Sequence, residues 1–291
     1  MIRFMRYRWL YFVISALVIL PGIYCLLRFG LKPGIDFTGG SLIELQANTD
    51  LSALRPVIET LVPVANLQQS SGNTFILRTK QLNEAEAQQL LQQLSGRFGE
   101  VKEVRFETVG PLLGRELVQK TLIGVIISAG FILLYVAYRF KNKKYGICAV
   151  LAMLHDSLVM LGVFSFLGAV KGVEVDALFV TAILTILSFS VHDTIVVYDR
   201  IRESTRLFSK LNYEELVDKA LNETMGRSIK NSLTIIFMLL ALYLLGGSTT
   251  KWFVFALLIG TVSGTYSSPF TAAPLLIIWD HLVSKRRDSR G

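Results

Sequence analysis

Two aspartates lie inside segments that are otherwise apolar enough to cross a lipid bilayer. Asp156 occurs in LAMLHDSLVMLGVF and Asp193 in ILSFSVHDTIVVYDR. A carboxylate at the centre of a bilayer costs about 2.5–3.5 kcal/mol even on the scale that penalises it least. Such residues therefore usually pair with a cation or serve the movement of an ion or a proton. The chemistry that these two residues suggest is ion or proton coupling.

The segment that contains Asp193 also carries a stripe of polar side chains. Thr181, Thr185, Ser188 and His192 recur at helical spacing, and this places them on one face of a helix with Asp193 at its edge. Polar residues inside a membrane helix usually face other helices or a water-filled path and not lipid. We therefore expect this face to meet a partner helix or to line a path for protons.

Arg227 stands just before the next apolar segment, in GRSIKNSLT, and its long side chain could reach back to a membrane carboxylate. Burial disfavours the charged form of a carboxyl group, whereas a nearby guanidinium favours it. Making and breaking a contact between Asp193 and Arg227 would therefore release and take up a proton. A permanent ion pair with a structural role explains the same two residues equally well.

Other chemistries fit these residues less well. His155 precedes Asp156 and His192 precedes Asp193, but a metal site would need further converging ligands, which the sequence does not suggest. His192 could titrate near neutral pH, although a role as a hydrogen-bond partner is favoured. The GxGD pattern expected of intramembrane aspartyl proteases does not occur in the sequence. We expect no metal, no other cofactor and no enzyme activity, with the proton as coupling ion.

A glycine-rich motif, GIDFTGGS, follows the first apolar segment. It combines Gly34, Asp36, Gly39 and Gly40, and the Lys-Ser/Thr pair that would complete a phosphate-binding loop does not follow. Glycine tolerates positive φ angles and the close approach of another backbone. We therefore interpret the motif as a tight turn or hinge.

These residues need a membrane bundle to position them, and the composition of the chain predicts one. Of its 291 residues 52% are hydrophobic and 18% are charged, below the roughly 25% charged residues of soluble domains. Six segments are long and apolar enough to cross a bilayer. The predicted spans are residues 9–29, 119–138, 145–170, 177–198, 230–247 and 252–279.

Basic residues set the expected orientation. With the N-terminus in the cytoplasm, 18 of the 30 Lys and Arg residues fall on the cytoplasmic side, and the outer side is neutral. This asymmetry follows the positive-inside rule and accounts for the net charge of +8, so nucleic acid is not expected as a partner. Both termini are predicted to be cytoplasmic in a plasma or inner membrane, and a thylakoid membrane stays open as an alternative.

Between the first two spans lies one extracytoplasmic domain, residues 31–115. Alternating apolar residues predict strands, and Asn83 followed by an amphipathic stretch predicts a capped helix. The order strand, helix, strand, strand, helix, strand is that of an α+β ferredoxin-like domain. The predicted strands are 41–46, 64–70, 73–80 and 101–110, and the predicted helices begin at 51 and 84.

The remaining segments complete the expected organisation. Residues 1–30 form the cytoplasmic N-terminus and the first span, and residues 116–291 form the other five spans. Within the latter, 199–229 is predicted to be an amphipathic cytoplasmic segment, either a helix along the membrane surface or a docking site for a cytoplasmic partner. Residues 280–291 are predicted to be a basic cytoplasmic tail.

Three motifs occur in order along the chain: GIDFTGGSLIEL, LHDSLVMLGVF and SVHDTIVVYDRIRE. With one outer domain between the first and second spans, they resemble the SecF members of the SecD/SecF family of protein-export membrane proteins, over nearly the whole chain. The resemblance implies membership of the proton-driven resistance-nodulation-division superfamily. It also implies that Asp193 is the membrane aspartate tied to proton flow and that Arg227 pairs with it. Asp156 would belong to the LHD motif of the family, and His192 stands where relatives often have Asn.

The resemblance further implies what the chain works with. It would form a heteromer with SecD, act with a SecYEG-type translocon and its accessory subunits, and contact membrane lipids. It would use the proton-motive force to promote the export of preprotein chains on the outer side of the membrane. Two other functions stay open. A proton-driven exporter of small molecules or lipids would need a larger outer domain, and a passive translocon scaffold would tolerate the loss of Asp193.

Overall fold

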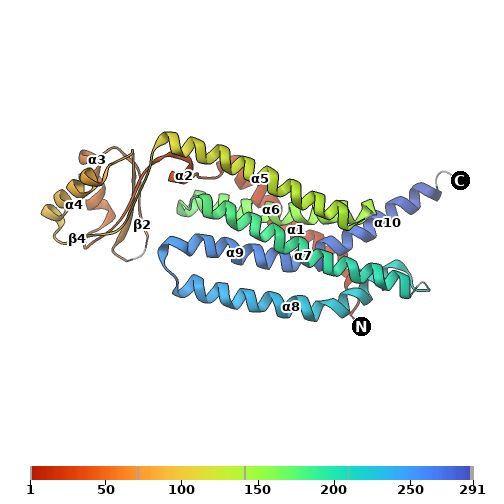
Figure 1. Cartoon of the computed structure of the whole chain (residues 1–291). Coiled ribbons are helices and arrows are strands. Elements are labelled where there is room, and N and C mark those ends of the chain that lie inside the picture. Colours follow the sequence, from red (N-terminus) through yellow and green to blue (C-terminus); the bar gives the residue numbers. More distant parts are fainter. Residues whose placement is uncertain (1, 71, 141, 209, 289–291) are drawn as a thin grey trace. The chain divides into compact units, whose positions relative to one another are not determined.

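The computed structural model describes residues 2–70, 72–140, 142–208 and 210–288. Their packing divides the chain into two units (Figure 1). A helix bundle contains Met1–Leu31, Val125–Val173 and Leu178–Gly291, and a sheet unit contains Lys32–Gly124 and Glu174–Ala177. The short stretch 174–177 therefore belongs to the sheet unit, although the chain on both sides of it belongs to the bundle.

The sheet unit has the architecture that the sequence predicts. Its strands are β1 (Gly40–Ala47), β2 (Val64–Gln69), β3 (Thr74–Thr79) and β4 (Val101–Val109), and its helices are α3 (Leu51–Leu61) and α4 (Glu84–Phe98). The spatial order is β2-β3-β1-β4, and every neighbouring pair is antiparallel. Each helix connects two strands that are separated by a third strand, which is the ferredoxin-like arrangement. The predicted α+β domain is confirmed.

Local sequence signals explain where these elements begin. In β3 buried and half-buried residues alternate, and Phe75 and Leu77 lie in the core. α4 begins with a capping box, in which Asn83 accepts the Glu86 N–H and Glu86 accepts the Asn83 N–H, both at 2.8 Å. Asp50 occupies the N-cap position of α3, but its side chain makes no capping bond. The alternation of apolar residues therefore predicts the strands. The N-cap residues mark where the helices begin, although the Asp50 side chain makes no capping bond.

Six helices within the described residues are long and apolar enough to cross a membrane, as predicted. The first extends over Phe4–Phe29 and contains α1 (Arg8–Phe29). The next four are α5 (Pro111–Arg139), α6 (Lys143–Lys171), α7 (Ala177–Leu207) and α8 (Tyr213–Leu245). The sixth extends over Thr249–Leu282 and consists of α9 (Ser248–Ser267), a π-helical turn η2 (Ser268–Ala272) and α10 (Ala273–Asp288).

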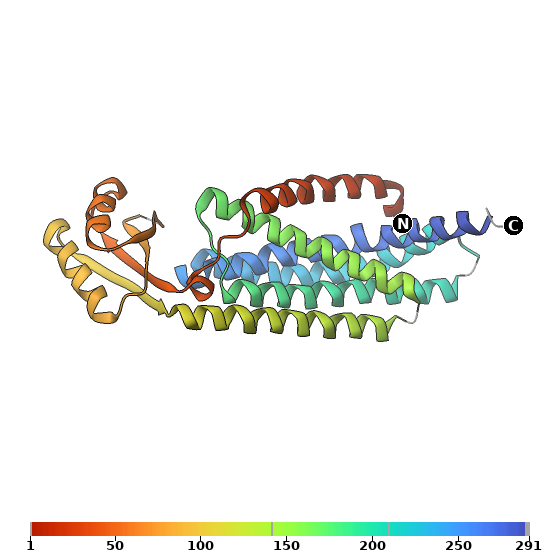
Figure 2. The same ribbon diagram turned by 90° about the horizontal axis from the view of Figure 1, so that it is seen from above.

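The helices of the bundle differ strongly in how much of their surface is covered. In the most apolar window of α6, 56% of the residues are buried, against 11% for the first span and 6% for α5. Figure 2 shows α1 and α5 on opposite flanks of the bundle, with α6, α7 and α9 between them. These three helices form the interior in which polar residues can be shielded from lipid.

The segment 199–229 differs from the prediction of a separate helix along the membrane surface. Residues 199–207 extend α7, and α8 begins at Tyr213 and continues without a break into the fifth span. No proline or glycine occurs in 199–207, so nothing local ends α7 at the membrane boundary. Asn212 then caps α8 by accepting the Glu215 N–H at 2.8 Å. The charged residues of this segment are therefore the ends of two long helices.

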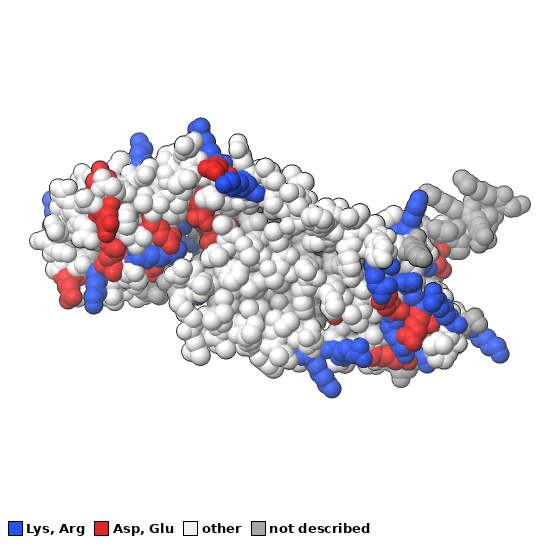
Figure 3. Space-filling model, viewed as in Figure 1, with Lys and Arg blue, Asp and Glu red and all other residues white. Residues whose placement is uncertain are grey.

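Charged side chains of the bundle gather near the connection of α7 and α8, whereas the middle of the surface seen in Figure 3 is uncharged. In the charged region Arg8 forms an ion pair with Glu214 of α8. An uncharged band with charges at its end is typical of a surface that crosses a bilayer. The predicted basic tail, 280–291, begins within α10, and its residues 289–291 lie outside the described residues.

The sixth span is continuous but contains the π-helical turn η2. Pro269 lies in this turn, and because proline has no N–H it cannot make the regular helical hydrogen bond there. Glycines just before the turn allow close packing on α7. A Cβ added at Gly260 would lie 2.5 Å from Ile186 Cγ1, and one added at Gly264 would lie 3.3 Å from Ser190 Cβ. This approach brings the serines of α9 next to the interior helices.

Candidate functional site

Asp156 lies in the interior of the bundle, where its side chain is fully buried. Its Oδ1 accepts a hydrogen bond from Ser263 Oγ at 2.6 Å. Its Oδ2 accepts from Ser267 Oγ at 2.7 Å and from Ser190 Oγ. His155 Nδ1 lies 3.0 Å from Oδ1. Both oxygens are therefore used, and three hydroxyls connect the carboxylate on α6 to α7 and α9.

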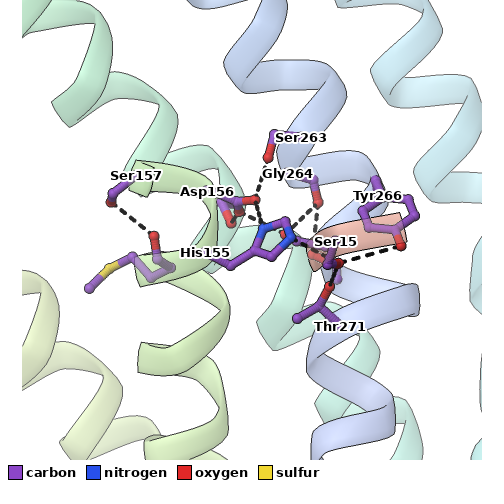
Figure 4. A network of polar contacts seen from close by, with 12 residues as sticks. Ser15, His155, Asp156, Ser157, Ser263, Gly264, Tyr266 and Thr271 are labelled. Atoms are coloured by element: carbon purple, nitrogen blue, oxygen red, sulfur yellow. Dashed lines mark hydrogen bonds and ion pairs between the residues drawn. The ribbon is translucent and has the colours of Figure 1, made fainter. Parts of the chain in front are cut away.

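His155 extends this network towards α1, as Figure 4 shows. Its Nε2 lies 3.1 Å from Ser15 Oγ, so both ring nitrogens have a polar neighbour. Ser15 Oγ is in turn 3.4 Å from Thr271 Oγ1 and 3.5 Å from the Tyr266 hydroxyl. The ring stacks on Tyr266 with the ring centroids 6.2 Å apart. One imidazole thus connects the buried carboxylate of Asp156 to the first span.

Asp193 is also buried, with 6% of its surface exposed, but it has fewer partners. Ser228 of α8 donates to its Oδ1 at 2.9 Å. Its Oδ2 is buried and has no hydrogen-bond partner among the described residues. The Ser268 hydroxyl also faces this carboxylate, but it donates to the Gly264 carbonyl at 3.2 Å. One oxygen of Asp193 is therefore available for a proton or a cationic group.

Arg227 is placed next to this site without entering it. It directly precedes Ser228 on α8, and its side chain is exposed in a groove of about 580 Å³ lined by residues of the same helix. Within the described residues, no ion pair joins Arg227 to Asp193. The pairing of these two residues stays a prediction that requires a movement of the arginine side chain or of α8.

The polar stripe of α7 is exposed on the surface of the chain. Thr181, Thr185, Ser188 and His192 are all exposed, and Thr185 Oγ1 donates to the Thr181 carbonyl at 2.8 Å. His192 is thus exposed although its sequence neighbour Asp193 is buried. Polar side chains on a membrane helix usually face a protein or water partner and not lipid.

The glycine-rich motif forms a short turn in the sheet unit. Ile35–Thr38 make one helical turn, α2, which is followed by Gly39 and Gly40 at φ angles of 72° and 117°. Residues other than glycine are strained at such angles. A Cβ added at Gly40 would also lie 2.7 Å from the Thr79 carbonyl oxygen. Both glycines are therefore needed where β1 begins beside β3.

The same motif holds the connection between α6 and α7. The Gly34 N–H donates to the Val175 carbonyl at 2.7 Å, and the Val175 N–H donates to the Lys32 carbonyl at 2.8 Å. Asp36 Oδ2 accepts the Ala177 N–H at 3.0 Å, so its carboxylate caps the first turn of α7. The helix that carries the stripe thus begins at a residue fixed by the motif. That the motif acts as a hinge stays a prediction.

An ion pair between Arg78 of β3 and Glu174 reinforces this attachment. Both side chains are largely buried. Burial lowers the pKa of Arg78 to about 10, and the nearby Asp176 carboxylate opposes that shift. The guanidinium therefore stays charged at neutral pH, and the ion pair persists there.

The serines around Asp156 are functional candidates that the sequence did not reveal. They lie 34, 107 and 111 residues from Asp156 along the chain, and serine is common in membrane helices. One signal was present, because Ser263 and Ser267 are four residues apart, on one side of a helix whose glycines at 260 and 264 favour close packing. That spacing indicates a packed polar face but does not identify which carboxylate it meets.

Comparison with known proteins identifies the family. The pattern described as Protein export membrane protein SecD/SecF, C-terminal, matches residues 89–282, and that of the SecD/SecF GG Motif matches residues 26–50. This chain belongs to the SecD/SecF family. The SecD/SecF GG Motif match contains the turn around Gly39 and Gly40, and the C-terminal match contains both buried aspartates of the bundle.

Relatives named Protein translocase subunit SecF are similar over nearly their whole length. One from Thermobaculum terrenum is 43% identical over 300 residues, covering 97% of this chain and 95% of the relative. One from Anaerolinea thermophila is 38% identical, with 96% of this chain and 94% of the relative covered. This member of the SecD/SecF family is accordingly a multi-pass transport subunit of the SecF type, in a family not known to catalyse a reaction.

Longer relatives carry the name SecDF, in which the names SecD and SecF are joined. Protein translocase subunit SecDF of Thermus thermophilus is 34% identical, covering 90% of this chain and 36% of the relative. The crystal structure of SecDF from Thermus thermophilus has a TM-score of 0.86 and 32% identity, covering 96% of this chain and 39% of that one. SecDF in a super-membrane-facing form has a TM-score of 0.72. The chain spans well under half of these SecDF proteins, and its predicted fold class is confirmed.

Proposed function

We propose that this chain is the SecF subunit that couples the proton-motive force to preprotein export, acting with SecD on the outer side of the membrane. Asp193 would carry the coupling proton, and Arg227 would be its cationic partner. The observation that carries this proposal is Asp193 Oδ2, which is buried and has no hydrogen-bond partner among the described residues.

A buried carboxylate with an oxygen that lacks a partner is costly when ionised and less costly when protonated. Such a group is suited to take up a proton from one side of the membrane and to release it to the other. One elementary charge that crosses 100 mV supplies about 2.3 kcal/mol, enough to shift a two-state equilibrium roughly fiftyfold. Proton transfer through Asp193 could therefore bias a rocking motion of the helices.

Arg227 is suited to the step that releases the proton. Its neighbour Ser228 already donates to Asp193, so a modest movement of α8 would change the distance between the guanidinium and the carboxylate. A guanidinium that approaches a carboxyl group favours its charged form. The open groove around Arg227 leaves room for that movement.

Asp156 is proposed to support coupling in a different way. Its two oxygens accept from Ser190, Ser263 and Ser267, and His155 lies at 3.0 Å. Hydrogen bonds that end on a carboxylate favour its ionised form. We therefore assign Asp156 a fixed negative charge around which α6, α7 and α9 are assembled.

A SecD partner is supported by the exposed stripe on α7. Helices of SecD against this stripe would shield its hydroxyls from lipid and would place His192 beside the interface, next to Asp193. The names and lengths of the SecDF relatives are consistent with such a pair. As a SecF subunit, the chain would have as further partners a SecYEG-type translocon, the accessory subunits of that translocon, exported preproteins and lipids.

Both termini are proposed to be cytoplasmic, in a plasma or inner membrane. The support is the charge asymmetry of the sequence, since the predicted topology assigns 18 of the 30 basic residues to the side of the termini and of the α7–α8 connection. The sheet unit would then lie outside the cytoplasm, where an emerging preprotein is met.

The proposal is tested by the rate of preprotein release from membrane vesicles that contain this chain and its SecD, with and without a proton gradient. We expect the gradient to accelerate release in the wild type and not in Asp193→Asn. Arg227→Gln should lose the response as well. Asp199→Asn is a matched control, because this aspartate lies on the same helix and pairs with Arg139 at the charged end of the bundle.

A gradient response that is equal in the wild type and in Asp193→Asn would contradict proton coupling at this residue. The passive-scaffold function would then explain the data better. Loss of the response in Asp199→Asn as well would show that any charge change in α7 disturbs export, and the assignment to Asp193 would fail.

A further inference from the structure

We propose that Ser15 and His155 are positioning residues through which a proton on His155 controls how firmly α1 is attached to the bundle. This inference goes beyond the coupling proposed for Asp193 and does not depend on it. It starts from α1 itself, where only Ser15 is buried within Arg8–Phe29, a range that the structure describes in full. A polar residue is therefore the most deeply inserted part of an otherwise apolar helix.

Other contacts hold α1 against α6 regardless of charge. A Cβ added at Gly162 would lie 2.5 Å from Gly22 Cα, so the two backbones touch there. Further along, Ser165 Oγ donates to the Gly30 carbonyl at 2.7 Å. Neither contact contains a group that titrates. The contact that can respond to a proton is the one between Ser15 Oγ and His155 Nε2, at 3.1 Å.

The state of one ring nitrogen is fixed by Asp156. The protonation of this nitrogen rests on the ionised state proposed above for Asp156. A carboxylate that accepts from three serines can only accept, so the ring nitrogen that faces it, His155 Nδ1, donates to it as an N–H. The ring nitrogen whose protonation can change is then Nε2. With a proton on Nε2 the imidazolium forms an ion pair with Asp156, and the two buried charges stabilise each other.

The proton on Nε2 decides the direction of the hydrogen bond to α1. When it is present, Nε2–H donates to Ser15 Oγ, and the Ser15 hydrogen can go to the Tyr266 hydroxyl, which itself donates to the Tyr11 carbonyl at 2.8 Å. When this proton is absent, Nε2 is an acceptor, and the Ser15 hydroxyl donates its single hydrogen to it. The bond to Tyr266 is then lost, and the remaining bond to the ring is no longer charge-assisted.

The groups around the ring are consistent with this switch. Asp156, on the same helix, and Tyr266, from α9, are the titratable side chains that contact His155 in the described part of the chain. α1 contributes Ser15, which is uncharged, and Ser190 of α7 reaches only the carboxylate. A change of charge in this cluster is therefore carried by His155.

The consequence concerns the part of α1 around Ser15. The charged ring attaches this part firmly, and the neutral ring loosens it. The following part of the helix is held in either state by the Gly22–Gly162 contact and by the hydrogen bond from Ser165 to the Gly30 carbonyl.

The test is a distance measurement by electron paramagnetic resonance on the full chain in lipid nanodiscs. One spin label is attached to Leu17→Cys of α1, two residues from Ser15, and the other to Ile147→Cys on the exposed side of α6, in a Cys25→Ser, Cys148→Ser background. We expect a narrow distance distribution at about pH 5 and a second, broader population at about pH 8. The ratio of the two populations should change about fivefold, as the loss of one hydrogen bond predicts.

Variants separate this switch from a merely structural role. In His155→Gln the distribution should not change with pH, and in Ser15→Ala it should be broad at every pH. Ser15→Thr keeps the hydroxyl and should restore the wild-type pH response. Ser157→Ala and His192→Gln are controls, because Ser157 bonds within its own helix and His192 is exposed, and both should respond like the wild type.

A pH response that survives in His155→Gln would overturn the proposal, since another group would then carry it. A narrow distribution in Ser15→Ala at low pH would overturn it equally, because α1 would be held without this hydroxyl. The measurement uses no gradient and no preprotein, so its failure is distinguishable from a failure of proton coupling at Asp193.

Discussion

Asp156 and Asp193 are buried aspartates of the same bundle, yet their surroundings differ. Asp156 accepts hydrogen bonds on both oxygens from serines of α7 and α9, and the His155 ring lies at 3.0 Å. Asp193 accepts one hydroxyl, that of Ser228, and its second oxygen has no hydrogen-bond partner among the described residues. The first carboxylate has hydrogen-bond partners on both oxygens, and the second has one oxygen without a partner in the described part of the chain.

Both aspartates are buried, so burial alone does not distinguish the roles proposed for them. Donors around a buried carboxylate compensate the loss of water, so the group can stay ionised at modest cost. The helices that supply the donors differ as well. The partners of Asp156 lie on interior helices, whereas Ser228 lies on α8, in whose most apolar window 17% of the residues are buried. A movement of α8 would therefore change the distance between Ser228 and Asp193 directly.

The largest difference in stability is expected between the two variants in which one of these aspartates is replaced by asparagine. Asp156→Asn turns an acceptor into a donor opposite three serine hydroxyls, and this should lower the free energy of unfolding by about 3 kcal/mol or more. Asp193→Asn removes a carboxylate that has one unpartnered oxygen, so it should change stability little or raise it. Denaturant titration of both variants in the same detergent measures the two values. Equal losses would mean that both sites hold fixed charges.

A smaller difference is expected for the serines that donate to the two carboxylates. Ser267→Ala removes a buried hydrogen bond to an ionised group, and this should cost about 1.5–3 kcal/mol. Ser228→Ala removes a bond to a carboxyl group that, on the proposed function, is protonated part of the time, and this should cost about 1 kcal/mol. The same unfolding experiment compares them. A larger loss in Ser228→Ala would reverse the assignment of fixed and exchangeable charge.

The smallest effect is expected for His192, the polar neighbour of Asp193. Its side chain is exposed, so His192→Gln should change the free energy of unfolding by less than about 0.5 kcal/mol. It should also preserve the response of preprotein release to a proton gradient at each pH tested. A gradient response that shifts along the pH axis in this variant would show that His192 takes part in proton transfer. The difference between Asp156 and Asp193 would then not be enough to explain coupling.

Much of the architecture could be predicted from local patterns. The six spans follow from long apolar runs, and the sheet unit follows from alternation and capping, as the Asn83 capping box illustrates. Both aspartates stand out because a carboxylate is rare in an apolar run. The predicted spans end where polar residues begin, at 198 and 230, whereas the helices extend further: α7 continues to Leu207 and α8 starts at Tyr213.

The partners of the aspartates could not be predicted, because they depend on packing between distant segments. Ser190, Ser263 and Ser267 meet Asp156 only because Gly260 and Gly264 let α9 approach α7 closely. Each serine alone is unremarkable in a membrane helix. The predicted contact of Asp193 with Arg227 was inferred from side-chain length, and side-chain length does not say in which direction a helix presents an arginine. In the structure the Arg227 side chain is exposed on the surface of the bundle.

The central claim is that Asp193 exchanges a proton while Asp156 stays ionised. The most direct test is infrared spectroscopy of the purified chain during a pH titration, following the carbonyl band of a protonated carboxylic acid. We predict a band that appears as the pH falls, that is lost in Asp193→Asn and that is retained in Asp156→Asn. A band that is retained in Asp193→Asn and lost in Asp156→Asn would contradict the account, since the exchangeable proton would then reside on Asp156.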